Sequence, residues 1–186
     1  MKNQGNLLDA LFELRDRYRD QAERGVKIVR ADELPWEINR HGKMCWYVHP
    51  AKNDTAIRSL VIYMQEIEPG GHSGKQASPG GIVHYILEGR GYVVVNGKKH
   101  SWTKGDCVGL PILSRPVEYQ FFNTDKKRVA RYIAATPNLF EVLGVDMGTR
   151  FEQLEDASVF ANETILDKQH DSVATGATTV QNVQAV

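Results

Sequence analysis

Between residues 44 and 136 the chain is a succession of short segments rich in Val, Ile, Tyr and Phe. GIVHYILEG and GYVVVNG are two of them, and the intervening turns include SPGG, EGRG, NGKK and KGD. β-Branched and aromatic residues favour strands, while Gly and Asn accept the positive φ of tight turns. Because no helical pattern separates the segments, we predict an all-β sandwich or barrel rather than a parallel α/β sheet.

An amphipathic helix is predicted in the N-terminal arm, residues 1–43. Asn6 is suited to cap this helix and Gly25 to end it. Apolar residues recur every three or four positions along it, namely Leu7, Leu8, Leu11, Leu14 and Tyr18. We expect this apolar stripe to lie on the outer face of the β domain or on a partner.

The region after the β domain has weaker signals. Residues 137–166 are predicted to be a helical or extended return segment that packs on the barrel. Residues 167–186 contain many Ala, Thr, Val and Gln but no aromatic residue. We interpret them as a flexible tail, or as an arm that becomes ordered on a partner.

Composition narrows the class of protein. The chain has 23 Lys and Arg against 23 Asp and Glu, so no positive excess favours binding to nucleic acid or to an anionic membrane. No apolar run is long enough to span a bilayer, and the N-terminus does not resemble a signal peptide. Cys45 and Cys107 lie in apolar sequence, as expected of reduced, buried thiols. We therefore expect a cytoplasmic protein without a membrane or nucleic-acid partner.

The glycine and proline spacing between residues 60 and 136 resembles that of the cupins. The first cupin motif would open at Gly70 and close at Gly89, and the second would include Gly105, Pro111 and Asn123. This resemblance implies a jelly-roll β-barrel with the N-terminal helix as an arm and the C-terminal residues as a tail.

The residues that bind the metal in cupins do not match. Counted along the motifs, the four ligand positions fall on Gln76, Ser78, Ile82 and Tyr119. An amide, a hydroxyl, an alkane and a phenol form a poor ligand set for a first-row transition metal. We expect neither a metal site nor catalytic residues in this chain.

A closer resemblance is to the small subunit of the two-subunit hydroquinone 1,2-dioxygenases. It rests on HGKMCWYVHP, PGGHSGKQ, GIVHYILEGRGYVVVNGKKHSW and VEYQFFN. The resemblance implies a non-catalytic cupin subunit, a larger cupin-type catalytic subunit that holds Fe(II), and a small hydroquinone-like aromatic substrate.

The barrel interior is expected either to collapse into an ordinary core or to form an apolar slot for an aromatic ring. His84 lies two residues beyond Ile82 and should face inward with it. In the second case Gln76, His84 and Tyr119 would be the polar groups of the slot. As part of the dioxygenase, this subunit would stabilise the larger one, and Trp46 or Trp102 would form an aromatic wall of the substrate pocket.

Other residues carry weaker indications. Glu66 and Glu68 are interpreted as the solvated face of a strand, with a carboxylate pair as the alternative. The loop residue His72 is interpreted as structural. IVHYIL and YVVV are apolar on both faces. We expect the N-terminal helix to cover part of their outer face and another subunit to cover the rest.

Two other functions remain open at this point. One is a stand-alone cupin enzyme, either an oxygenase with a non-motif metal site or a metal-free isomerase that uses His84 and Tyr119 as acid and base. The other is a sensor module that binds a small aromatic molecule.

Overall fold

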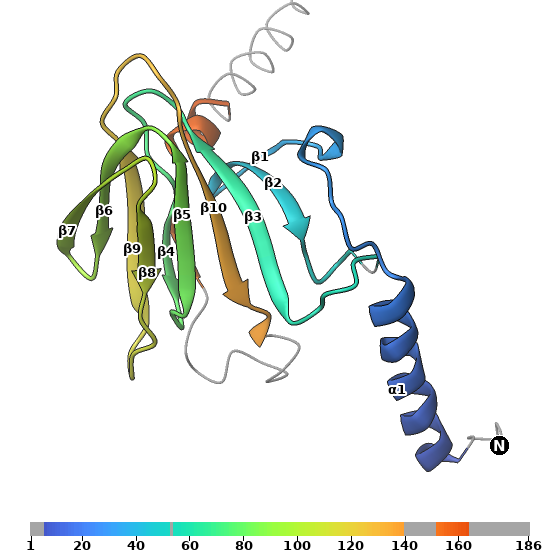
Figure 1. Cartoon of the computed structure of the whole chain (residues 1–186). Helices are drawn as coiled ribbons and strands as arrows, with labels where there is room; N and C mark the ends of the chain where they lie inside the picture. Colours follow the sequence, from blue (N-terminus) through green and yellow to red (C-terminus); the bar gives the residue numbers. More distant parts are fainter. Residues whose placement is uncertain (1–5, 53, 140–151, 164–186) are drawn as a thin grey trace, which may run out of the picture.

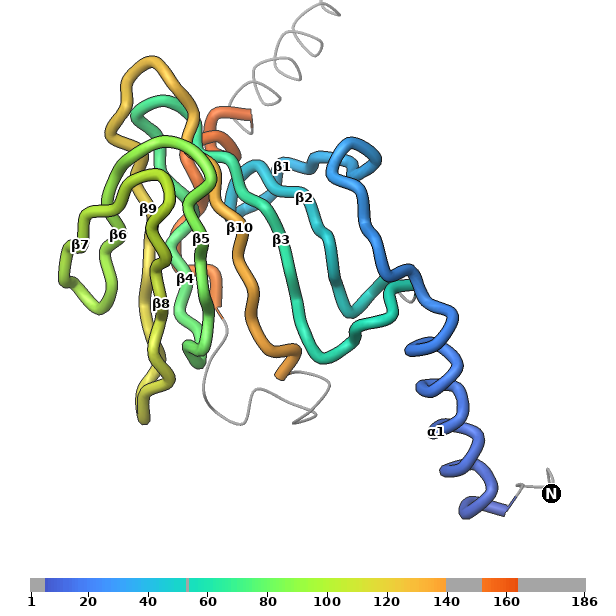
Figure 2. Tube along the Cα trace, viewed as in Figure 1, coloured from blue at the N-terminus to red at the C-terminus, as the bar shows by residue number. Residues whose placement is uncertain are grey.

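A computed structural model describes residues 6–52, 54–139 and 152–163 of the chain. Two antiparallel β-sheets packed face to face form the body of the protein (Figure 1). The chain crosses repeatedly from one sheet to the other (Figure 2), which is the jelly-roll connectivity that the sequence predicts. The prediction of an all-β cupin fold with an N-terminal helix is confirmed.

Within the described residues, one sheet has six strands and the other has five. The larger sheet has the order β1 (Glu37–Asn39), β2 (Gly42–Val48), β3 (Leu60–Ile67), β10 (Ala130–Pro137), β5 (Ile82–Glu88) and β8 (Cys107–Leu110). The smaller sheet has the order β11 (Glu152–Glu155), β4 (Lys75–Ser78), β9 (Val117–Asn123), β6 (Arg90–Val95) and β7 (Lys98–Thr103). The helix α1 (Leu7–Arg24) and the 3-10 turn η1 (Ala31–Glu33) precede them.

The core lies between the two sheets and is built by strand alternation. On β5 the inward residues Ile82, His84 and Ile86 are buried, whereas the outward Val83, Tyr85 and Leu87 are exposed. The aromatic rings of Phe121 and Tyr132 come from opposite sheets and pack with their centroids 4.6 Å apart. The inward position predicted for His84 is therefore correct.

The motif glycines mark the turns of the barrel. Gly70, Gly89 and Gly105 have φ values of 70°, 89° and 92°, in the left-handed region that favours glycine. Gly89 is also crowded, since a Cβ at this position would lie 2.7 Å from the Ala130 side chain. This explains on steric grounds why a glycine ends β5.

Asn123, at the end of β9, joins two loops. Its side-chain amide donates to the carbonyl oxygens of Ile67, Glu68 and Arg128 at 3.2, 3.0 and 2.8 Å. Asn123 is 3% exposed, so these bonds form away from water. The motif asparagine is therefore a structural residue of the barrel end.

An ionic row crosses the outer face of the larger sheet. Glu66 on β3 forms ion pairs with Lys43 of β2 at 2.8 Å and with Arg131 of β10 at 2.6 Å. Arg131 also pairs with Glu88 at 3.1 Å. Burial raises the pKa of Glu66, but the two cations outweigh it and hold that pKa below its usual value. Interpreting Glu66 as a simply solvated side chain is wrong, because only 11% of the side chain is exposed.

The N-terminal helix forms as predicted but does not cover the β domain. Asn6 Oδ1 caps it by accepting from the Leu8 amide at 2.9 Å. None of its residues is buried, and it projects away from both sheets (Figure 1). Only its C-terminal end is tethered, through Gln21 Nε2 to the Thr55 carbonyl at 3.0 Å. The expectation that its apolar stripe lies on the barrel is wrong for this chain alone.

Two further predictions concern the cysteines and the C-terminal region. Cys45 is buried, but Cys107 is exposed because it points outward from β8 at the sheet edge. Residues 152–155 of the predicted return segment form β11, which pairs with β4. The tail, residues 167–186, lies outside the described residues. No helix in the described part of the chain has the length and apolar character needed to cross a membrane.

Candidate functional site

A cavity of about 420 Å³ lies in the barrel between the two sheets. Aromatic side chains from three strands form much of its wall: Trp46 on β2, Tyr63 on β3 and Tyr119 on β9. Ligand sites in proteins are typically concave, mostly apolar and of this size. The barrel interior has therefore not collapsed completely into core.

The four positions of the cupin metal motif meet at this cavity. Gln76 and Ser78 on β4, Ile82 on β5 and Tyr119 on β9 all line it. Gln76 and Tyr119 are directly opposite each other in the β4–β9 register. The spacing of the motif thus identified correctly which side chains converge inside the barrel.

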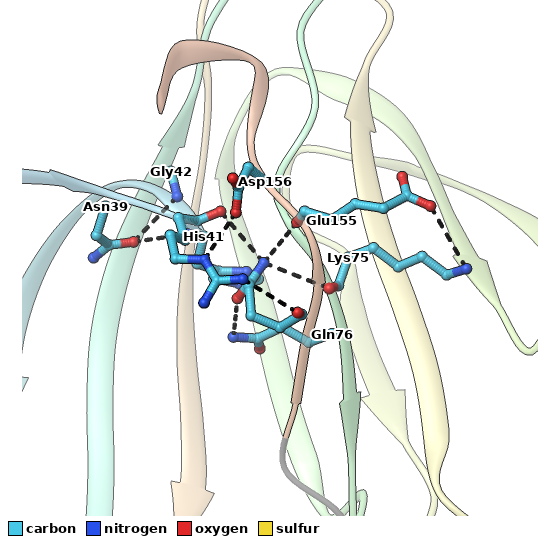
Figure 3. A network of polar contacts seen from close by, with 9 residues as sticks. Asn39, His41, Gly42, Lys75, Gln76, Glu155 and Asp156 are labelled. Carbon is cyan, nitrogen blue, oxygen red and sulfur yellow. Dashed lines mark hydrogen bonds and ion pairs between the residues drawn. The ribbon is translucent and has the colours of Figure 1, made fainter. Parts of the chain in front are cut away.

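A chain of hydrogen bonds occupies the motif positions. Tyr119 donates from its hydroxyl to Gln76 Oε1 at 2.6 Å, and Gln76 Nε2 donates to Gln153 Oε1 at 3.0 Å. Gln153 lies on β11 and donates from Nε2 to the Glu155 carbonyl at 2.8 Å, within the network of Figure 3. Burial raises the pKa of Tyr119 well above its ordinary value, so the phenol keeps its proton and acts as the donor.

These residues do not fit a metal ion. Ile82 has no donor atom, Ser78 Oγ accepts from the Gly80 amide at 3.2 Å, and the oxygens of Gln76 and Tyr119 bond to each other. Elsewhere in the described residues, no group of three or more His, Cys, Asp or Glu side chains is placed to hold a metal.

Trp46 is held firmly in the cavity wall. Its indole Nε1 donates to Glu37 Oε1 at 2.8 Å, and its ring packs 5.3 Å from that of Tyr63 and 4.8 Å from that of His49. Trp102, the alternative aromatic wall, is instead part of the packed core and is 4% exposed.

His84 is close to the cavity but behind its wall. It is fully buried, with its ring centroid 4.7 Å from Phe121 and 5.7 Å from Tyr119, and it is not a lining residue. Burial and the neighbouring His41 lower the pKa of His84 to about 3, and the Val108 backbone offsets this only in part. The structure therefore brings Gln76, Tyr119 and Trp46 together around the cavity and leaves His84 outside it.

His41 is a cavity residue that the sequence analysis did not select. It lies in the tight turn between β1 and β2, lines the cavity and is 5% exposed. Burial lowers its pKa to about 4, so the imidazole is neutral near pH 7. The sequence Asn-Arg-His-Gly between two strands could have indicated this position, because it is typical of a tight turn. Such a turn places His41 at the end of a hairpin.

The comparisons with known proteins agree with this fold. Residues 63–136 match the model of the Cupin domain family. The polyketide cyclase RemF from Streptomyces resistomycificus is 17% identical with a TM-score of 0.50, over 60% of this chain and 79% of that one. A cupin-like protein from Thermotoga maritima is 20% identical with a TM-score of 0.46, over 72% of this chain and 86% of that one.

A predicted oxalate decarboxylase from Thermotoga maritima is also similar, at 20% identity and a TM-score of 0.47, over 58% of this chain and 96% of that one. The comparison with curated protein sequences gave no match. The match to the family model runs from β3 to β10 and includes the four motif positions that line the cavity. Residues 63–136 of this chain therefore match the cupin domain family, and they include the strands that carry the four motif positions.

Proposed function

We propose that this chain is a cytoplasmic, non-catalytic cupin subunit that binds a small aromatic ring in its barrel. In this proposal it serves an Fe(II)-dependent dioxygenase that opens hydroquinone-like rings, and a larger cupin-type subunit holds the iron. The observation that carries the proposal is the Tyr119–Gln76 hydrogen bond, which uses the motif ligand positions while an aromatic-lined cavity stays open beside them.

The cavity supports an aromatic ligand by its shape and its lining. Tyr63 and Trp46 present ring surfaces from neighbouring strands, and aromatic pairs favour edge-to-face or offset contacts over other packing. No metal is needed to hold a neutral ring in such a site. Both cysteines are free, which suits a reducing compartment.

Two uncovered apolar surfaces support a protein partner. On the outer face of β5, Val83, Tyr85 and Leu87 are 48%, 47% and 38% exposed. On α1, Leu7 and Leu11 are 78% and 63% exposed. Contiguous apolar surface of this kind typically marks an interaction site, and the larger subunit is the partner that we propose for it.

A stand-alone enzyme is the main alternative, since a polyketide cyclase shares the fold. An acid–base pair of His84 and Tyr119 is a weak basis for it. With a pKa of about 3, His84 is a poor base, and it does not line the cavity. A sensor module is the second alternative, and it shares the same cavity but requires no partner.

The test is native mass spectrometry with iron analysis on the untagged protein, purified from its own cells under nitrogen. A complex of this chain with a larger one, in which iron follows the larger chain after separation, is the expected result. A homo-oligomer with stoichiometric iron would overturn the proposal. A metal-free homo-oligomer that binds aromatic probes would favour the sensor module instead.

A further inference from the structure

His41 has an imidazole with no partner for either ring nitrogen. Among the described residues, neither Nδ1 nor Nε2 makes a hydrogen bond, although both atoms are buried and the side chain lines the cavity. Buried polar atoms are nearly always hydrogen-bonded, and an exception calls for a physical reason. A ligand that enters the cavity and bonds to the ring would supply that reason.

The position of His41 is firmly set by its backbone. Its amide donates to Asn39 Oδ1 at 2.9 Å (Figure 3), and its carbonyl accepts from Gln65 Nε2 at 2.6 Å and from the Gly74 amide at 2.9 Å. The ring lies edge-on to Tyr63 and Tyr119, with centroids 6.4 and 6.3 Å away. The unpartnered ring is thus held in place rather than left loose.

Two polar side chains of the cavity, Tyr119 and Gln76, already take part in hydrogen bonds. The Tyr119 hydroxyl donates a hydrogen bond to Gln76 Oε1, and Gln76 Nε2 donates one to Gln153 Oε1. Arg40, at the edge of the cavity, is paired with Asp156 at 2.9 Å, so it is not a free cation for an anionic ligand.

We propose that His41 is the residue that selects the ligand, and that it binds the hydroxyl of a neutral phenol whose ring lies against Trp46, Tyr63 and Tyr119. This inference rests on the proposed function, because it requires the cavity to bind an aromatic ring.

The chemistry of the two groups is complementary. A neutral imidazole has one N–H donor and one nitrogen acceptor, and a phenol hydroxyl both donates and accepts. The burial that keeps His41 neutral also disfavours a charged ligand, because an unpaired anion is costly in an apolar cavity. The site therefore prefers a phenol to a phenolate or a benzoate.

The experiment compares two probes that differ by one group, 4-methylphenol and 1,4-dimethylbenzene. Their dissociation constants are measured by calorimetry on the full chain, as wild type and as His41→Phe, with His100→Phe on the exposed strand β7 as the matched control. We expect the preference of the wild type for the phenol to fall by about tenfold in His41→Phe, the equivalent of one hydrogen bond. His100→Phe should keep the wild-type preference.

Stability separates a binding role from a structural one. Because His41 makes no side-chain hydrogen bond that Phe would lose, His41→Phe should melt at the wild-type temperature or above it. A preference that is the same in wild type and His41→Phe, with both probes bound, overturns this inference alone. If the wild type binds neither probe, the aromatic cavity of the proposed function fails, and the inference fails with it.

Discussion

Tyr119 donates its hydroxyl proton to Gln76 Oε1 at 2.6 Å, and the two residues face each other across β4 and β9 at positions where a metal-binding cupin would carry ligands. This hydrogen bond engages the Tyr119 hydroxyl and Gln76 Oε1, the two oxygens that these positions could otherwise offer to a metal. The bond also joins the barrel interior to β11, because Gln76 in turn donates to Gln153. Two positions of the cupin metal motif thus form part of the cavity wall.

Replacing Tyr119 with Phe should test this bond directly. The change leaves the buried Gln76 oxygen without its donor, and we expect a loss of about 1–2 kcal/mol in the free energy of unfolding. Urea denaturation provides the measurement. Tyr85→Phe is the matched control, because Tyr85 is 47% exposed and its loss of a hydroxyl should cost under about 0.5 kcal/mol. Equal effects of the two substitutions would contradict a role for the Tyr119–Gln76 bond.

Gly89→Ala should destabilise the protein more than Gly97→Ala. Both glycines have positive φ, at 89° and 80°, so each substitution costs about 1 kcal/mol of backbone strain. Only at Gly89 would the new Cβ meet another side chain, that of Ala130, whereas nothing lies within 4 Å at Gly97. Overpacking adds about 1–3 kcal/mol. Thermal and urea unfolding of the two variants should reveal the difference, and similar losses would show that the clash relaxes at no cost.

Acid should destabilise the protein progressively between about pH 6.5 and 3. Burial lowers the pKa of His41 to about 4 and that of His84 to about 3, so the unfolded chain binds protons that the folded chain does not. Stability is therefore full above pH 6.5 and falls as the pH drops, by up to about 1.4 kcal/mol per pH unit for each histidine. The facing groups Tyr63, Tyr119 and Tyr132 have raised pKa values and stay neutral throughout.

The measurement is the urea midpoint at several pH values. His41→Phe should remove about half of this pH dependence, and His100→Phe, on the exposed strand β7, should leave it unchanged. A midpoint that does not vary across this range in the wild type would show that the two imidazoles are not held neutral by the fold.

The outer face of β5 should be needed for assembly but not for folding. Tyr85→Lys and Leu87→Lys place a charge on side chains that are 47% and 38% exposed, so the isolated chain should lose under about 1 kcal/mol. If the larger subunit packs on this face, the same changes should release it, which native mass spectrometry would detect. Ile112→Lys, at a residue 75% exposed in the loop after β8, is the control that should leave the complex intact. A complex that survives both β5 substitutions would place the interface elsewhere.

Much of the fold followed from local patterns. The alternation of Ile82, His84 and Ile86 predicted which face of β5 is buried, and the spacing from Gly70 and Gly89 identified the side chains that meet in the barrel. These predictions succeed because strand alternation and turn conformation depend on a few neighbouring residues. The apolar stripe of α1 was also read correctly, but its place was not, because periodicity tells that a face needs a partner and not which surface provides it.

By itself, the sequence determined an all-β barrel with cupin spacing and a poor set of side chains for a metal at the four motif positions. Only the tertiary structure decided that Tyr119 and Gln76 bond to each other, that His84 lies behind the cavity wall and that His41 lines it. The physical reason is that burial and hydrogen-bond partners depend on residues far apart in the chain. His41 is buried because its hairpin is fastened to Gln65 and Gly74, which lie 24 and 33 residues further along.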